Sequence, residues 1–81
     1  MSGLDKVKVV KILKKCGDAT SLTKIMDDLN WSNKTKFMNK YILPLLELNI
    51  IIMTLPNKSK SPNQKYKTTE KGKKLLEVLN G

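Results

Sequence analysis

The side chains best suited to contact a polyanion lie in two stretches of the chain, at residues 33–40 and 58–67. Lysine ammonium and asparagine amide groups donate hydrogen bonds to phosphate oxygens and to acceptor atoms on base edges. The residues that we single out for this role are Asn33, Lys34, Lys36, Asn39, Lys40, Lys58, Lys60, Lys65 and Lys67. Their chemistry is that of binding, and nucleic acid is the partner that it favours.

The balance of charge supports a polyanionic partner. The chain has sixteen lysines and seven acids, a formal net charge of +9 at pH 7. Residues 55–68 hold four of the lysines and no acid, whereas residues 1–50 hold nine lysines and five acids. Every positive side chain is a lysine, so the bidentate arginine–guanine contact is unavailable and base contacts are less directional. We expect ready affinity with modest base selectivity.

Residues able to form a catalytic or metal centre are scarce. The chain has no histidine and a single cysteine, Cys16, which excludes an internal disulfide and the usual ligands of zinc or haem. Asp27 and Asp28 are paired carboxylates, but neighbouring helix positions point about 100° apart, which favours a solvated face over acid–base chemistry. No nucleophile–base pair can be named. We predict a protein that is not an enzyme, uses no cofactor and keeps Cys16 in its core.

Two helices are predicted at the start of the chain. Residues 4–16 repeat apolar side chains at helical spacing, and Gly17 ends that helix. Ser21 caps a second helix that runs to about Leu29. The apolar positions of these helices are Val9, Ile12, Leu13, Cys16, Leu22, Ile25, Met26 and Leu29, with Val7 and Val10 interpreted as core flank in preference to a dimer contact.

A third helix carries the first stretch of donors. Ser32 caps it, and it continues towards Leu48 with a kink or restart just before Pro44, because proline lacks an N–H and clashes with the preceding turn. The inward residues are expected to be Phe37, Met38, Tyr41, Leu45 and Leu48, and the outward ones Asn33, Lys36, Asn39 and Lys40. That outward face is either a surface that contacts bases and phosphates or an ordinary solvated face.

A β-hairpin and a last helix come next. Residues 49–54 are apolar and β-branched and predict a buried strand, and a second strand begins near Gln64. The intervening residues 56–63 form a polar, lysine-bearing loop that must project into water. Thr69 then caps a helix that runs to Leu79. Its inward residues are Leu75, Leu76 and Leu79, and Gly72 allows a strand or helix to approach closely.

The predicted fold class is α+β, mainly α, with a three-helix core, a β-hairpin wing and a C-terminal helix in a single domain of residues 1–81. This order of elements resembles a winged helix-turn-helix domain over essentially the whole chain. Residues 41–76 are similar to the C-terminal winged-helix segment of bacterial and archaeal transcriptional regulators of the Fic-like or RecG-helicase-related kind. The matching positions are Tyr41, Pro44, Leu45, Leu46, Thr54, Pro56, Lys58, Ser61, Gln64, Lys65, Tyr66, Thr69, Glu70, Lys71 and Gly72.

The resemblance implies the DNA-binding module of a transcriptional regulator, with the third helix in the major groove and the lysine-rich wing on the backbone. In that family the segment follows an ATP-binding domain, so the chain is expected to be either a domain of a larger protein or a small stand-alone relative. Two departures are lysine where relatives often carry arginine in the third helix, and Asn49-Ile50 in place of the usual turn before the strand.

Other uses of the fold remain open on sequence. A protein-interaction or oligomerisation module is the main alternative, and it predicts a hydrophobic patch on an exposed helix. RNA binding is a third, although only Trp31 and Tyr66 could stack on bases and both are expected in the core. A homodimer is possible, with its contact on the terminal helices at residues 4–16 and 70–79.

The sequence also predicts where the chain resides. It has no apolar run long enough to span a membrane. Its first ten residues place charges where a secretory signal needs an apolar segment. We therefore expect a cytoplasmic location without membrane contact.

Overall fold

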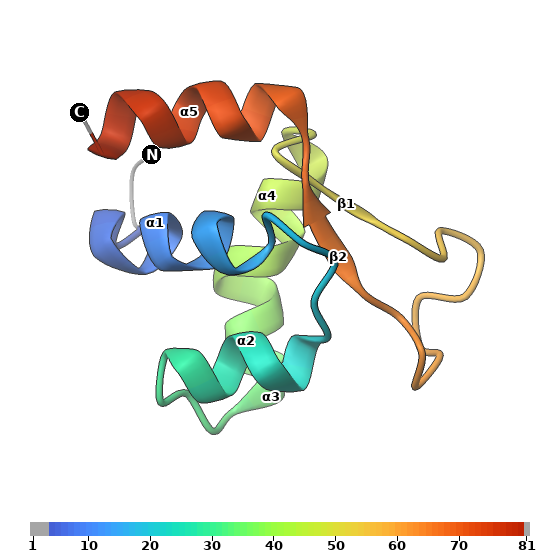
Figure 1. Cartoon of the computed structure of the whole chain (residues 1–81). Helices are drawn as coiled ribbons and strands as arrows, with labels where there is room; N and C mark the ends of the chain where they lie inside the picture. Colours follow the sequence, from blue (N-terminus) through green and yellow to red (C-terminus); the bar gives the residue numbers. More distant parts are fainter. Residues whose placement is uncertain (1–3, 81) are drawn as a thin grey trace.

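A computed structural model describes residues 4–80, which form four helices and one antiparallel hairpin (Figure 1). This content confirms the α+β, mainly α class. The elements in chain order are α1 (Lys6–Lys15), α2 (Leu22–Asp28), α3 (Lys34–Phe37), η1 (Met38–Ile42), α4 (Leu43–Glu47), β1 (Ile51–Met53), β2 (Tyr66–Thr68) and α5 (Glu70–Asn80). The segments α3, η1 and α4 adjoin one another without interruption and together make one long helix, called here the third helix.

Helix α1 begins where a side chain caps it. The Val7 N–H donates to Asp5 Oδ1 over 2.9 Å, which satisfies one of the free donors of the first turn. The four inward residues predicted for this helix, Val9, Ile12, Leu13 and Cys16, are all buried. The interpretation of Val7 as core flank is wrong, because its side chain is 63% exposed.

The cap of the third helix is one residue later than predicted. Asn33 Oδ1, and not the Ser32 hydroxyl, accepts from the Lys36 N–H over 3.0 Å. Both residue types suit this position, so the sequence pattern alone does not separate them. The consequence is that Asn33, predicted as an outward donor, uses its amide oxygen to hold the first helical turn.

The predicted interruption before Pro44 takes the form of a π-helical turn, η1. Its closing bond runs from the Leu43 N–H to the Met38 carbonyl, five residues back. A wider turn needs no N–H from proline and relieves the clash of its ring with the preceding carbonyl. Ile42 within the turn and Leu45 beyond it are buried, the latter as predicted, whereas Leu48, predicted inward, is 46% exposed at the C-terminal end of α4.

The hairpin is shorter than predicted but better connected. Strand β1 begins after Asn49, whose φ of 58° ends the third helix in the left-handed region. Strand β2 pairs with β1 on one side. On its other side Tyr66 exchanges two backbone hydrogen bonds with Thr20, from the connection between α1 and α2. Strand β2 is therefore flanked on both sides, and the hairpin is fixed to the helical body.

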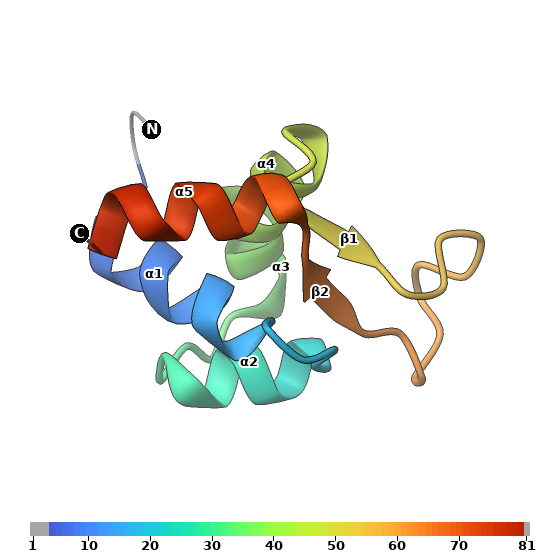
Figure 2. The same ribbon diagram turned by 45° about the horizontal axis from the view of Figure 1, so that its top comes forward.

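Helix α5 returns along α1 (Figures 1 and 2). Thr69 Oγ1 accepts from the Gly72 N–H over 3.0 Å, which confirms the predicted cap. The predicted close approach at Gly72 is also confirmed, because a Cβ there would overlap the Ile50 carbonyl and lie 2.6 Å from Thr68 Cγ2. The missing side chain lets α5 begin directly against the hairpin.

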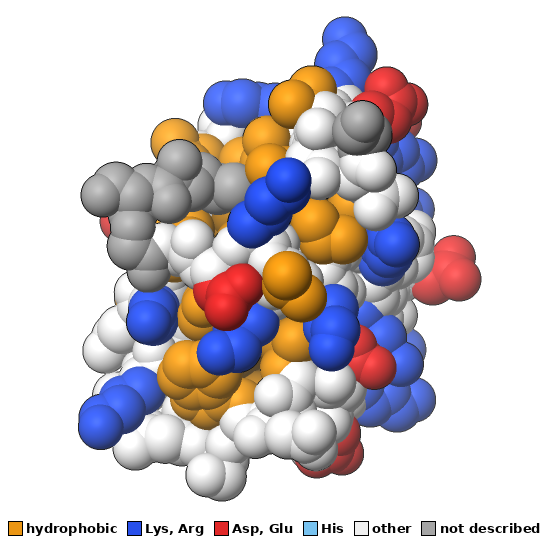
Figure 3. Space-filling model, turned by 90° about the vertical axis from the view of Figure 1, so that its left-hand side faces the viewer, with side chains coloured by type: hydrophobic (Ala, Val, Ile, Leu, Met, Phe, Trp, Pro, Cys, Tyr) orange, Lys and Arg blue, Asp and Glu red, His pale blue; other side chains and the backbone are white. Residues whose placement is uncertain are grey.

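The terminal helices, expected to offer a dimer contact, pack against each other within the chain. On the face drawn in Figure 3, basic and acidic side chains interrupt the hydrophobic surface of this end of the molecule. Among residues 4–80, no helix is both long and apolar enough to cross a membrane.

Candidate nucleic-acid interface

The first two turns of the third helix present a row of donors. The Asn33 cap sets their orientation, because it fixes the backbone from which Lys34 and Lys36 extend. Lys34, Lys36, Asn39 and Lys40 are all exposed, as predicted. The Lys40 ammonium lies 5.8 Å from the centre of the Tyr41 ring, close enough for a weak cation–π attraction that keeps the chain near the helix.

The loop that joins β1 to β2 is held at its base by the buried side chain of Gln64. The Leu55 N–H donates to Gln64 Oε1 over 2.9 Å, and Gln64 Nε2 donates to the carbonyls of Leu55 (2.5 Å) and Lys58 (3.0 Å). Lys58 and Lys60 remain exposed on the loop. This role of Gln64 was not predicted, although a glutamine directly after the turn residues at 61–63 was the available signal.

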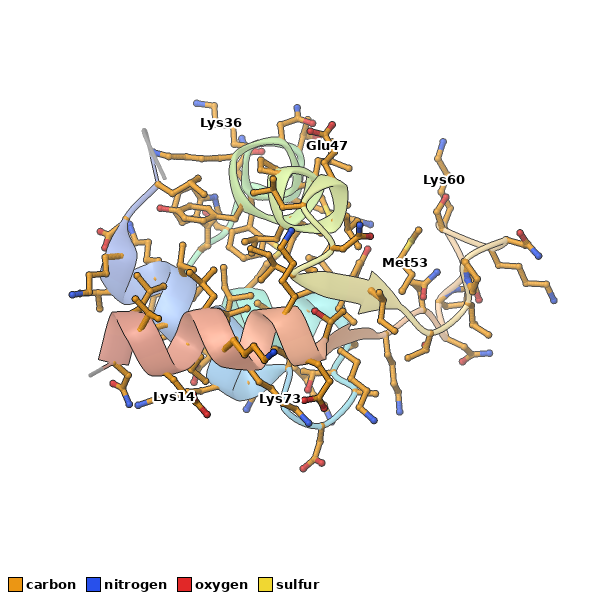
Figure 4. The ribbon with its side chains drawn as sticks, turned by 90° about the horizontal axis from the view of Figure 1, so that it is seen from above. Lys14, Lys36, Glu47, Met53, Lys60 and Lys73 are labelled. Carbon is orange, nitrogen blue, oxygen red and sulfur yellow. The ribbon has the colours of Figure 1, made fainter. Side chains whose placement is uncertain are left out.

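The predicted lysines fall into separate groups. Figure 4 shows Lys36 on the third helix and Lys60 on the loop along one edge of the molecule, with Lys14 and Lys73 along the opposite edge. Lys34 and Lys60 line a common groove between the third helix and the loop. Lys67 lies on the exposed face of β2, directly across from Ile52 of β1.

Lys65 belongs to another surface. It lines a polar hollow of about 320 Å³ together with lysines that the sequence reasoning did not select, namely Lys14, Lys15 and Lys24. Asp18 is the acid in this lining. These lysines come from the end of α1, from α2 and from the hairpin, so only the tertiary fold brings them together.

The candidate lysines have no acidic partner in an ion pair among residues 4–80. Within those residues the one ion pair joins Lys73 Nζ to Glu70 on α5 over 3.4 Å. Glu47, an exposed acid near the end of α4, lies on the same edge as Lys36 and Lys60 in Figure 4. The basic character of this edge is therefore strongest over α3 and the loop.

The groove between the third helix and the hairpin loop has an apolar lining. It measures about 670 Å³, and Met53, one of its lining residues, is labelled in Figure 4. Its apolar side chains come from α2, the third helix, β1, the loop and β2: Leu22, Met26, Met38, Leu43, Leu46, Met53, Pro62 and Tyr66. Several elements contribute to this apolar lining, so it differs from the hydrophobic patch on one exposed helix that the interaction-module alternative predicts.

The aromatic side chains lie in the core or pack against it. Tyr66 is buried. Trp31 is half-buried against Phe37 and Tyr41, with ring centres 5.6 Å and 5.7 Å away, and the Lys8 ammonium lies 4.9 Å above its ring. Neither ring is presented as an open platform for base stacking, which disfavours the RNA-binding alternative.

Cys16 lies in the core, as predicted. Burial raises the pKa of its thiol to about 12, because the thiolate would lose its hydration. Burial, and then the nearby Cys16, raise the pKa of the Tyr66 hydroxyl. In the described part of the chain, no group of three or more His, Cys, Asp or Glu side chains is placed to hold a metal ion.

Comparison with known proteins identifies the family. The model of the family described as filamentation induced by cAMP protein Fic-like, C-terminal domain, matches residues 7–69. A crystal structure of a Fic family protein from Desulfovibrio desulfuricans G20 is 32% identical in sequence and superimposes with a TM-score of 0.70. That match covers 85% of this chain and 21% of the Desulfovibrio chain. Among proteins with curated descriptions, none matches. From α1 to the cap of α5, this chain belongs to the family of Fic-like C-terminal domains.

Proposed function

We propose that this domain binds double-stranded DNA as a winged helix-turn-helix and serves as the DNA-binding module of a transcriptional regulator. In this assignment α2 and the third helix are the helix-turn-helix, and the hairpin with its loop is the wing. The element order supports it, as does the pairing of Thr20 with Tyr66, which ties the wing to the helices. The domain would act by binding and not by catalysis.

One observation carries the proposal: unpaired lysines of the third helix and of the wing project from the same edge of the molecule (Figure 4). Asn33, Lys34, Lys36, Asn39 and Lys40 would meet the major groove and its bordering phosphates. Lys58, Lys60 and Lys67 would contact the backbone as it passes the wing. Lys65, predicted for the same role, lies on another surface and is left out of this contact.

The energetics would be mainly electrostatic. If about six lysines neutralise phosphates, the logarithm of the association constant falls with the logarithm of salt concentration with a slope of about −5. Lysine contacts to base edges are less directional than arginine contacts, so base selectivity would be modest.

The test measures affinity for a mixed-sequence duplex over a range of salt concentrations. Changing both Lys36→Glu and Lys40→Glu places two negative charges on the third helix. We expect a loss of at least about a hundredfold in affinity and a shallower salt slope. Circular dichroism confirms that the variant folds.

The matched control changes Lys71→Glu and Lys74→Glu, two exposed lysines on α5. It alters net charge by the same amount, so any purely global effect appears in both variants. If the two variants lose affinity equally, the third helix is not the contact. If the unaltered chain fails to bind duplex even at low salt, DNA binding is refuted and the interaction-module alternative takes its place.

A further inference from the structure

Binding to DNA would not account for the apolar lining of the groove between the third helix and the wing. Its lining is dominated by aliphatic and thioether side chains, and Leu43 in it is 42% exposed. DNA offers such a surface little beyond thymine methyl groups, because its phosphates and base edges are polar. Leaving this apolar area against water is unfavourable, so a partner that covers it would gain free energy.

We propose that this groove docks an acidic, amphipathic helical segment of a partner protein. The apolar face of that segment would lie on the groove floor, with large side chains at helical spacing. Its carboxylates would meet Lys34 on the helical wall and Lys60 on the loop wall. Among the described residues 4–80, no acidic side chain lines the groove, so its lysines attract negative charge without competition from a neighbouring acid.

The chemistry of the lining suits a peptide. The side chains of Met26, Met38 and Met53 all line the groove. Methionine is unbranched and polarizable and adapts to the shapes of different apolar side chains. A volume of about 670 Å³ has room for several such side chains at once, within the range of about 300–1,000 Å³ typical of binding pockets.

Charge argues against a second copy of this chain as the occupant. Each copy carries a formal net charge of +9, and bringing two together adds like-charge repulsion around the same lysines. An acidic segment instead relieves the repulsion within the domain. The charge complementarity of the rim therefore favours a partner that is negative as well as apolar.

Docking would have a consequence for the proposed DNA contact. A helix in the groove would cover Lys34 and Lys60, which the DNA contact also uses, so peptide and duplex would compete. The docking itself does not rest on DNA binding. It can be measured with no DNA present, and its failure would leave the DNA test unaffected.

The experiment uses a designed fluorescent peptide of about three helical turns, with leucines at i, i+3 or i+4, and i+7 and glutamates elsewhere. Anisotropy measures its affinity for the whole chain. Spectra of protein labelled at methionine methyl groups report the place of binding, and the Met26, Met38 and Met53 signals should shift. Two comparison peptides replace the glutamates with lysine or the leucines with serine, and both should bind at least about tenfold more weakly.

Leu43→Glu should lower the affinity for the acidic peptide at least about tenfold. The matched control is Ile52→Glu, because Ile52 is 47% exposed but lies outside the groove, across from Lys67. It should change the affinity less than about twofold. Equal effects of the two variants, binding of the lysine peptide as tight as that of the glutamate peptide, or unshifted methionine signals would each overturn the proposal. Self-association of the free chain that Leu43→Glu abolishes would assign the groove to a second copy instead.

Discussion

The side chain of Gln64 hydrogen-bonds both backbone groups of Leu55, nine residues earlier in the chain. It thereby closes the wing loop in the way that a further pair of strand residues would. The loop itself has successive turns, with the Lys58 N–H donating to Leu55 and the Ser61 N–H donating to Lys58, each over 3.0 Å. A buried amide replaces the apolar anchor that this polar loop lacks.

Gln64→Ala should therefore loosen the wing. The change leaves the Leu55 N–H without its partner, at a cost of about 1–3 kcal/mol, and removes one of the two donors to each of the carbonyls of Leu55 and Lys58. Hydrogen exchange should show faster exchange at the Lys58 and Ser61 amides, and urea unfolding should report the loss of stability. Asn63→Ala, which alters an exposed side chain of the same loop, is the control. Unchanged exchange at both amides would contradict this role for Gln64.

Gly72→Ala tests the contact between α5 and the hairpin. Alanine raises helix propensity by up to about 1 kcal/mol over glycine, which on its own would stabilise α5. The new methyl group, however, would overlap the Ile50 carbonyl and press on Thr68 Cγ2, and backbone cannot move aside as a flexible side chain can. We expect the steric overlap to outweigh the gain in helix propensity, with a net loss of about 2 kcal/mol in the free energy of unfolding.

Urea unfolding measures this loss, and Gly17→Ala is the matched substitution. Its Cβ would lie 3.2 Å from the Lys14 carbonyl, a contact that a small shift relieves, so the change in stability should be smaller. If Gly72→Ala proves as stable as the unaltered chain, α5 must be able to move away from β1.

The packed helices were predictable, because the apolar side chains that they bury recur in the sequence with the period of a helix. Val9, Ile12, Leu13 and Cys16 follow that period and all lie in the core. The alternation of β2 was predictable for the same reason, with exposed lysines on either side of buried Tyr66. Val7 shows the limit of this reasoning, since a valine at the margin of a stripe is buried only if a neighbouring element reaches it.

The π-helical turn was only half predictable. Pro44 indicated an interruption, but proline can be accommodated by a kink, a break or a wider turn, and tertiary packing decides among them. Beyond the turn Leu45 is buried as predicted, whereas Leu48 is 46% exposed where α4 ends. The burial of Leu48 therefore depends on where the helix ends, which the spacing of residues does not specify.

The candidate site, too, could be predicted only in part. Exposure of the lysines on α3 and on the loop followed from local pattern. The apolar groove could not be foreseen, because its lining combines side chains from α2, the third helix and the hairpin that are far apart in sequence. The meeting of Lys65 with Lys14 and Lys24 has the same tertiary origin.

Cys16 should be inert in the folded protein. Burial raises the pKa of its thiol to about 12, so at about pH 8 almost none is the reactive thiolate. Thiol reagents should modify it only as fast as the chain unfolds, and urea should accelerate labelling to the rate of a free cysteine. Rapid labelling without denaturant would show that Cys16 is accessible.

The same pKa shift predicts a loss of stability in alkali. In the unfolded chain the thiol has its ordinary pKa of about 8.5, whereas in the folded chain burial raises that pKa to about 12. Between these values the unfolded state binds fewer protons, so stability falls as pH rises, by up to about 1.4 kcal/mol per pH unit. Unfolding measured from pH 8 upwards should show a shallower decline in Cys16→Ala. An identical decline in both proteins would contradict the assignment.

Asn33 combines a structural role with a place in the proposed DNA contact, and two substitutions separate them. Asn33→Ala removes the oxygen that accepts from the Lys36 N–H and should cost about 1 kcal/mol in the free energy of unfolding. Asn33→Asp keeps an equally good cap, so stability should hold, but it adds a negative charge beside Lys34 and Lys36. DNA affinity should then fall in Asn33→Asp, although the fold is intact. Equal DNA affinity of Asn33→Asp and the unaltered chain would remove the start of α3 from the proposed interface.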